Sequence, residues 1–212
     1  MSYTIQEIAE ALGAKALGAT DLKIDSVAEP AEATASQLAL AMKPEFAAQI
    51  AAGQARAAML WEGADWESLG LEAAILAPRP RFALAGLSAM MDPGQGWATG
   101  IHPSAVGTVI GPHCFVGADC VIGEGGFLRE GVRIGARVRI GARFTAQPGA
   151  VIGGDGFSFV TPEVSGVERA RETLGDQGDV QKQSYARIHS LGSVTIGDDV
   201  EIGVNACVDR GT

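Results

Sequence analysis

Three histidines are the residues of this 212-residue chain whose chemistry is considered first. Transfer of an acyl group to an amine or a hydroxyl needs a general base near the nucleophile, and histidine fills that role most often. His102 and His113 are interpreted as solvated surface side chains, whereas His189 is the better candidate for a base. Even for His189, a structural hydrogen-bonding role is the favoured interpretation.

The histidines and cysteines do not have the spacing of a metal site. No two histidines are spaced so that their imidazoles would converge on one ion. Cys114, Cys120 and Cys207 occupy or adjoin small apolar positions, which predicts buried thiols in a reducing compartment. We therefore predict no metal, no other cofactor and no disulfide framework.

Five arginines lie within fifteen residues of a chain whose formal net charge is −9: Arg129, Arg133, Arg137, Arg139 and Arg143. One interpretation is a solvated outer face. The other is a docking surface for a phosphorylated or acidic partner such as an acyl carrier protein, because guanidinium groups bind phosphate in a bidentate manner. The acidic balance of the whole chain argues against general affinity for nucleic acid or anionic membranes.

The elements that must position these groups are set by a six-residue period. An aliphatic or alanine residue returns at every sixth position, and glycine follows six of the eight: Ile110, Val116, Ile122, Leu128, Ile134, Ile140, Ala146 and Ile152. Arg129 and Gln147 replace the glycine in the other two. A second, mostly small apolar set precedes each hexad's strand: Cys114, Cys120, Gly126, Val132, Val138, Phe144 and Ala150.

A period of six fits neither an α-helix nor a simple strand. It predicts a hexapeptide β-helix, in which three hexads close one coil and parallel coils stack on one another. Glycine, which is abundant in the second half of the chain, suits its tight corners because it accepts a positive φ.

The predicted organisation has three parts. Residues 1–91 form a small α/β domain, 92–100 a turn-rich linker, and 101–212 the β-helix, with a loop excursion over 154–187. In the first part, Thr4 and Glu7 have the spacing of a capping box for a helix that ends at Gly13. Further helices are predicted from Pro44 and Pro80, with short apolar strands between them.

The two ends of the chain lead to predictions about its location and about the end of its β-helix. The N-terminus lacks a basic segment followed by an apolar one, and no run approaches the ~20 apolar residues of a membrane span, so a soluble, cytoplasmic protein is expected. The other end, at Thr212, falls within the resumed repeat. A truncated β-helix, or one covered by another chain, is expected because coil stacks need a cap.

Several motifs together resemble the UDP-3-O-acylglucosamine N-acyltransferase family of lipid A biosynthesis. They are the coil opening Ile-His-Pro-Ser-Ala, the loop entry Gly-Gly-Asp-Gly-Phe and the segment Val-Asp-Arg-Gly. The resemblance implies a homotrimer of left-handed β-helices. It also implies transfer of a 3-hydroxyacyl chain from acyl carrier protein to the 2-amine of a UDP-linked 3-O-acylglucosamine, at sites between subunits.

By the same resemblance, Lys43, Phe46, Asp155, Gly156 and Phe157 are assigned to substrate binding. The family's uridine-binding stretch typically has an aromatic residue, then Asn, Pro, Lys and Tyr. Here Leu40 replaces the aromatic residue, Lys43 the asparagine and Phe46 the tyrosine. Lys43 provides no hydrogen-bond acceptor for a uracil edge, although its ammonium group can meet a phosphate.

The family's general base lies a couple of dozen residues after Asp-Arg-Gly, beyond Thr212. No catalytic residue is therefore assigned, and the 212-residue chain alone is predicted to be inactive. The alternatives left open are a non-catalytic trimeric scaffold or binding protein, and another hexapeptide acetyltransferase that uses His189. The coil before Asp155 is also shorter than the family usually shows.

Overall fold

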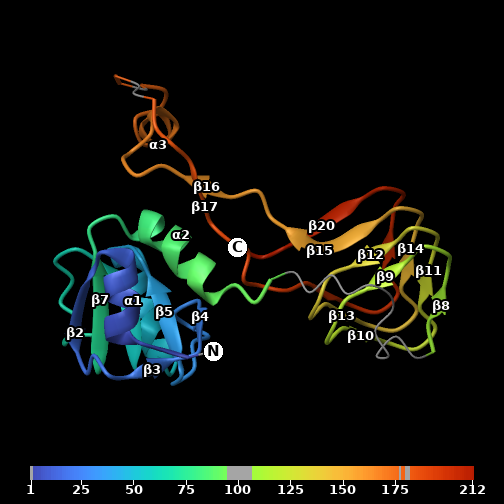
Figure 1. Ribbon diagram of the computed structural model, residues 1–212, viewed down its shortest axis with the longest axis horizontal. Coiled ribbons are helices and arrows are strands. Elements are labelled where there is room, and N and C mark those ends of the chain that lie inside the picture. The colour runs from blue at the N-terminus through green and yellow to red at the C-terminus, as the bar shows by residue number, and fades with distance from the viewer. Residues whose placement is uncertain (1, 95–106, 177, 180–181) are drawn as a thin grey trace. The chain divides into compact units, whose positions relative to one another are not determined.

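A computed structural model describes residues 2–94, 107–176, 178–179 and 182–212 (Figure 1). The chain divides into two compact units, unit 1 with Met1–Met91 and Phe159–Ile188, and unit 2 with Asp92–Ser158 and His189–Thr212. The sequence predicts that residues 154–187 are an excursion of the β-helix. Phe159–Ile188, which is most of that segment, groups with unit 1, so the chain leaves the coil there and makes a second contribution to the α/β unit.

Unit 1 is built on a five-stranded sheet with the order β2-β7-β6-β5-β4. The strands are β2 (Lys15–Gly18), β4 (Ser26–Ala28), β5 (Gln37–Ala41), β6 (Ala57–Trp61) and β7 (Ala73–Ala77). All neighbours are parallel except β2 and β7. A small antiparallel pair joins β1 (Tyr3–Thr4) to β3 (Lys23–Ile24). Strand β2 was not predicted, because Lys-Ala-Leu-Gly has no distinct apolar run.

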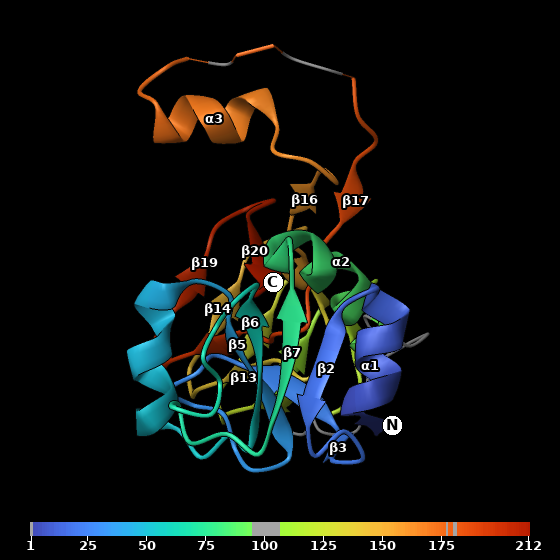
Figure 2. The same ribbon diagram turned by 90° about the vertical axis from the view of Figure 1, so that its left-hand side faces the viewer.

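Helices cover both faces of this sheet (Figure 2). Helices α1 (Ile5–Leu12) and α2 (Pro80–Met91) contribute Ile5, Ile8 and Leu87 to one hydrophobic cluster. The 3-10 helix η1 (Pro44–Ala52) contributes Ile50 to a second cluster on the opposite face. Because both faces are buried, the central strands are continuous apolar runs and do not alternate with polar residues.

Helix α1 follows directly from its sequence. The Thr4 side chain accepts a hydrogen bond from the Glu7 backbone N–H, and the Glu7 carboxylate accepts one from the Thr4 N–H, which completes the predicted capping box. Gly13 ends the helix in the left-handed conformation, with φ of 60°. These groups satisfy backbone donors and acceptors that a helix end would otherwise leave unpaired.

The second contribution to unit 1 is a hairpin with a polar helix beyond it. Strands β16 (Phe159–Val160) and β17 (Ala186–Arg187) pair antiparallel, and Val160 and Ile188 pack against Ala85 of α2. Arg79 donates hydrogen bonds to the carbonyl groups of Thr161 and Glu163 and to the Glu168 carboxylate, at 3.0, 3.0 and 2.9 Å. Helix α3 (Gly166–Glu172) follows and buries none of its residues.

Unit 2 consists of short parallel strands in three sheets. One sheet has the order β10-β13-β18, with β10 (Val121–Ile122), β13 (Arg139–Ile140) and β18 (Thr195–Ile196). The second has the order β19-β14-β11-β8, with β8 (Val109–Ile110), β11 (Phe127–Leu128), β14 (Thr145–Ala146) and β19 (Glu201–Ile202). The third has the order β20-β15-β12-β9, with β9 (Phe115–Val116), β12 (Arg133–Ile134), β15 (Val151–Asp155) and β20 (Cys207–Arg210).

The pairing register shows why a six-residue repeat closes into coils. Arg133 pairs with Val151 and Val121 with Arg139, so the chain returns to the same sheet after three hexads. In each strand the second residue points inward, and the small apolar set joins it in one continuous core. Ile134, Phe144 and Ile152 are fully buried there. After the excursion, Thr195 pairs with Arg139 and the stacking resumes in register. The predicted coil stack is confirmed.

The sequence predicts that the hexad glycines serve tight corners with a positive φ. In the structure, most of the glycines that follow the inward residue instead allow close approach of the next coil. A Cβ on Gly123 would lie 2.6 Å from the Ala142 nitrogen in the next coil, so this position is glycine because the backbones approach closely. Positive φ values fall two residues later in the hexad, and there His113, Asp119, Arg137 and Arg143 occupy the left-handed corner as well as three glycines. The corner therefore does not require glycine, whereas the close approach of the next coil does require it at strand ends such as Gly123.

Candidate functional site

Lys43 and Phe46, two of the predicted substrate-binding residues, lie at the start of η1 in unit 1. Lys43 precedes the helix in an extended conformation, and its ammonium group is 3.7 Å from the Glu45 carboxylate with both side chains well exposed. Such an exposed pair holds the lysine only weakly. The Phe46 ring packs partly into the cluster under η1, whereas Leu40 packs with the α1 and α2 cluster on the opposite face. Leu40 and Phe46 therefore do not form one stacking surface.

Asp155, Gly156 and Phe157, the other predicted residues, lie together in unit 2 where β15 ends. The Asp155 carboxylate accepts a hydrogen bond of 2.8 Å from Nε of Arg210. The Gly156 N–H donates to the Ser190 hydroxyl at 2.9 Å. A Cβ on Gly156 would lie 3.1 Å from Oγ1 of Thr212 and 3.4 Å from Oγ of Ser190, so a side chain there would press on both hydroxyls. The Phe157 side chain is 90% exposed.

A polar network in unit 2 connects these residues with His189. Arg210, whose side chain is only 2% exposed, lies within 2.8 Å of the Asp155 carboxylate and 3.4 Å of the Asp92 carboxylate. The other oxygen of Asp92 is 2.9 Å from Nδ1 of His189. Burial raises the pKa of Asp92, but hydrogen bonds from His189 and the Gly94 N–H and the charge of Arg210 outweigh it, so this pKa lies below its ordinary value.

His189 makes a hydrogen bond with a carboxylate, which a structural role and a catalytic role would both use. Its Nδ1 is committed to Asp92, a geometry that fixes the orientation of the imidazole ring. His113 is exposed at a left-handed corner with φ of 60°, as expected for a surface residue. His102 lies outside the described residues. Sequence reasoning missed Asp92 and noted Arg210 only as part of the Val-Asp-Arg-Gly motif, because each is separated by tens of residues from the groups it contacts.

The five arginines of the β-helix do not form one surface. Arg133 is in β12 and Arg139 in β13, which belong to different sheets. The guanidinium groups of Arg129 and Arg133 lie over the rings of Phe127 and Phe115 at 5.4 and 5.7 Å. Arg143 forms an exposed ion pair with Asp199, 2.5 Å from its carboxylate. A docking surface that included both Arg133 and Arg139 would have to extend over two faces of the coil.

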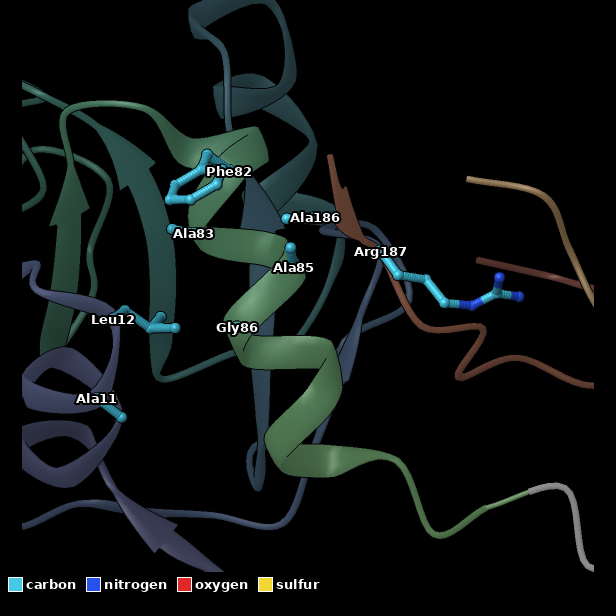
Figure 3. Close-up of a pocket in the computed structure, with 8 residues that line it drawn as sticks. All are labelled: Ala11, Leu12, Phe82, Ala83, Ala85, Gly86, Ala186 and Arg187. Carbon is cyan, nitrogen blue, oxygen red and sulfur yellow. The ribbon is translucent and has the colours of Figure 1, made fainter. Parts of the chain in front are cut away.

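A pocket of about 340 Å³ lies in unit 1 between α1, α2 and β17 (Figure 3). Its lining is mainly apolar and includes Leu12, Phe82 and Gly86. The side chain of Arg187, the one charged residue of the lining, extends away from α2 in Figure 3. The pocket contains none of the predicted site residues. Its lining contains one charged side chain and is otherwise apolar, so it lacks the set of several polar side chains that orients a ligand in a typical binding site.

Two further features concern the part of the chain that the structure describes. Within it, no group of three His, Cys, Asp or Glu side chains is arranged to hold a metal ion. None of its helices combines the length and the apolar character needed to cross a bilayer.

The coils define the class of protein. A family model described as the hexapeptide repeat of succinyl-transferase matches residues 107–142 and 193–212. Both stretches lie in unit 2, one before the excursion and one after it. The chain is a hexapeptide-repeat protein with a small α/β unit and a left-handed parallel β-helix.

Comparison over all 212 residues gives relatives with a more specific name. The chain is 59% identical to a UDP-3-O-acylglucosamine N-acyltransferase of Ruegeria pomeroyi, 48% identical to one of Paracoccus denitrificans and 36% identical to one of Pseudomonas putida. Each match covers 100% of this chain and 66%, 65% and 62% of the relative, respectively. The chain is similar to these acyltransferases over its whole length, and it spans slightly less than two thirds of the length of these relatives.

Proposed function

We propose that the whole protein is an N-acyltransferase of lipid A biosynthesis. It transfers a 3-hydroxyacyl chain from acyl carrier protein to the 2-amine of UDP-3-O-acylglucosamine. The observation that carries the proposal is the 59% identity, over all of this chain, to a relative with that name. The motifs that sequence analysis singled out, Asp155-Gly156-Phe157 and Asp209-Arg210-Gly211, support it because they lie side by side at the ends of paired strands.

The two groups of predicted site residues have separate roles in this proposal. Lys43 meets a phosphate of the nucleotide, because its ammonium group is exposed and only weakly held by Glu45. Phe46 presents a ring edge to the uracil base of the nucleotide, since the rest of the ring is packed in the core. Asp155, Gly156 and Phe157 contact the sugar or acyl part of the substrate. Lys43 cannot read the acceptor and donor pattern of uracil, so phosphate and sugar contacts supply most of the affinity.

No catalytic residue is assigned within the 212 residues. His189 is oriented by Asp92 in a structural network, and family resemblance puts the base outside this chain. We therefore expect the 212-residue chain to give no transfer when it is incubated with acyl carrier protein thioester and the aminosugar nucleotide. Turnover at the rate of a full-length relative would contradict this expectation and would make His189 the first candidate for the base.

The proposal includes three properties of the whole protein: a homotrimer, a cytoplasmic location, and acyl carrier protein as partner. For the carrier protein, the exposed Arg133 and Arg139 are the candidate contacts, whereas Arg143 is already paired with Asp199. Because Arg133 and Arg139 lie on different sheets, we expect charge reversal at only one of them to weaken carrier binding, with Arg143→Glu as the control on a third position. Unchanged carrier binding in both single variants would remove these arginines from the interface.

Titration calorimetry with UDP-N-acetylglucosamine tests the nucleotide-binding part of the proposal. We expect measurable affinity for the native chain and about fivefold weaker binding for Lys43→Ala, as for the loss of one exposed phosphate contact. Lys15→Ala, which removes another exposed lysine of unit 1, is the matched control. No binding of the native chain at millimolar concentration would favour a non-catalytic scaffold over a retained substrate site.

A further inference from the structure

The base of the excursion is held by two sets of hydrogen bonds within unit 2. The chain leaves the coil after Asp155 and Gly156 and returns at His189 and Ser190. The Gly156 N–H donates to the Ser190 hydroxyl, which joins the leaving strand directly to the returning one. Arg210 joins them a second time, because it contacts Asp155 on one side and Asp92, the partner of His189, on the other.

The chain passes between the two units at three places, and this network includes a residue at or near each of them. Asp92 is the first residue of unit 2, His189 is the first residue on the return, and Asp155 lies three residues before the exit. Arg210, at the end of β20, is the group that connects all three through its contacts. Ser190 is fully buried beside it.

The energetics of Arg210 point to positioning and not to stabilisation. Its charge is removed from water and faces two carboxylates, and within the described residues its buried Nη1 has no acceptor. Buried ion pairs of this kind contribute little net stability compared with apolar residues of similar volume. An incompletely paired donor makes the balance less favourable still. Such a group is better suited to fixing one arrangement of the segments that it connects.

We propose that Arg210 is a positioning residue for the Asp155-Gly156-Phe157 segment. It clamps the two ends of the excursion to the end of β20 and so fixes the direction in which the chain leaves the coil. The step from this clamp to substrate recognition rests on the proposed function, which assigns residues 155–157 to substrate contacts. Arg210 itself is predicted not to touch the substrate, because its side chain is buried and neutralised by the two carboxylates.

Hydrogen–deuterium exchange of the full 212-residue chain tests the clamp without relying on activity. In Arg210→Gln we expect the amides of residues 154–157 to exchange about tenfold faster, as for the loss of a buried charged hydrogen bond. Arg210→Lys, which keeps the charge, is expected to rescue part of the protection. Arg143→Gln removes an arginine from an exposed ion pair of the same coil and should leave this segment unchanged.

The double variant Asp155→Asn/Arg210→Gln separates positioning from folding, because it leaves no unpaired charge at this ion pair. We expect native-like thermal stability and native exchange in β13 and β14, with the faster exchange at residues 154–157 retained. Unchanged exchange at residues 154–157 in both Arg210→Gln and the double variant would overturn the proposal. Equal acceleration in β13 and at residues 154–157 would also overturn it, because Arg210 would then support the whole coil.

Binding of UDP-N-acetylglucosamine to the same variants links the clamp to recognition. We expect the Arg210→Gln chain to bind at least about fivefold more weakly than the native chain, and Arg210→Lys to be intermediate. If the native chain shows no binding, the proposed function fails while the exchange result still decides the clamp. If binding is native-like although residues 154–157 have lost protection, the clamp stands and its role in recognition is wrong.

Discussion

Strand β6 of unit 1 and strand β12 of unit 2 bury their residues in different ways. In β6, Ala57 and Met59 join the cluster under α1 and α2, while Ala58 and Leu60 join the one under η1. In β12, Ile134 faces the core of the coil and Arg133 faces outward. The first strand is apolar throughout because helices cover both faces of its sheet, whereas the second needs only one apolar residue per hexad.

This difference shows how near to one another in the sequence the residues that specify each core lie. A coil closes wherever three hexads follow one another, so each hexad specifies its own place in unit 2. The sheet of unit 1 instead depends on helices that are distant in sequence, and it also receives the hairpin of β16 and β17. We therefore expect substitutions in the two units to differ in size and in how far their effects extend.

The largest effect is expected for Phe144→Ala in the core of the coil. Phe144 is fully buried at a position that is small in most other hexads, so its truncation leaves a cavity that neighbouring coils cannot fill. We expect the free energy of unfolding of unit 2 to fall by about 3–5 kcal/mol. Thr145→Ala, one residue later and pointing outward, is the matched control and should change little.

Fluorescence reports whether this loss stays within unit 2. In a Trp97→Phe background the remaining tryptophans, Trp61 and Trp66, pack in the η1 cluster of unit 1. We expect their thermal transition to keep its midpoint in Phe144→Ala, while the β-sheet signal in circular dichroism melts earlier. A common shift of both signals would contradict the idea that the two cores are independent.

Gly123→Ala tests whether the hexad glycine is required by the next coil. The added Cβ would lie 2.6 Å from the Ala142 nitrogen, so the coils must separate, at a cost of about 1–3 kcal/mol. Gly203 occupies the same hexad position, but among the described residues no atom lies within 4 Å of where its Cβ would be, so Gly203→Ala should be neutral or slightly stabilising. Equal thermal midpoints for the two variants would mean that contact with the next coil does not explain this glycine, and that its backbone conformation does.

The local character of the hexads also explains what could be predicted from the sequence. The period of six predicted the inward residues from Ile110 to Ile152, because each hexad contains its own signal. The Thr4 and Glu7 spacing predicted α1 for the same reason. Helix α3 was not predicted, although Ser165 and Glu168 form the same capping box, because its sequence has no apolar face that would indicate a buried helix.

The candidate site was predictable only in part. Asp155 and Gly156 were found through family resemblance, since their immediate sequence is distinctive. Their partners Arg210 and Ser190 lie 55 and 34 residues away, and no periodic pattern connects them. The pairing of His189 with Asp92 spans 97 residues. Contacts of this range depend on how the excursion returns to the coil, which sequence spacing does not specify.

Asp92 provides a pH test of the network that joins the ends of the excursion. Its pKa is lower in the folded chain than in the unfolded one, so the unfolded state binds the proton more readily. The resulting stability is fully present above the ordinary carboxyl pKa and is lost as the pH falls through the lowered value. We expect Asp92→Asn to cost about 1.5 kcal/mol at neutral pH and less in acid.

Thermal melts between pH 7 and pH 3 measure this dependence. The difference in midpoint between the native chain and Asp92→Asn should shrink steadily below about pH 4. Asp65→Asn, which removes an exposed carboxylate from unit 1, is the control. A difference that stays constant over this range would mean that Asp92 contributes through its shape and hydrogen bonds, with no contribution from its charge.

The smallest effect compares one capping box in two surroundings. Thr4→Ala removes the cap of α1, whose Ile5, Ile8 and Ala9 are buried in the core of unit 1. We expect it to lower the stability of that unit by about 1 kcal/mol. Ser165→Ala removes the same cap from α3, which buries nothing, so it should speed amide exchange within α3 without moving the thermal midpoint.

The pair therefore separates the strength of a local signal from its effect on the fold. An isolated seven-residue helix is only marginally stable in water, so α3 can unfold without taking the hairpin with it. Helix α1 cannot do so, because losing its first turn exposes Ile5 and Ile8. If Ser165→Ala lowered the midpoint as much as Thr4→Ala does, α3 would have to be part of the cooperative unit, and Arg79, which binds Glu168, would be the contact that couples them.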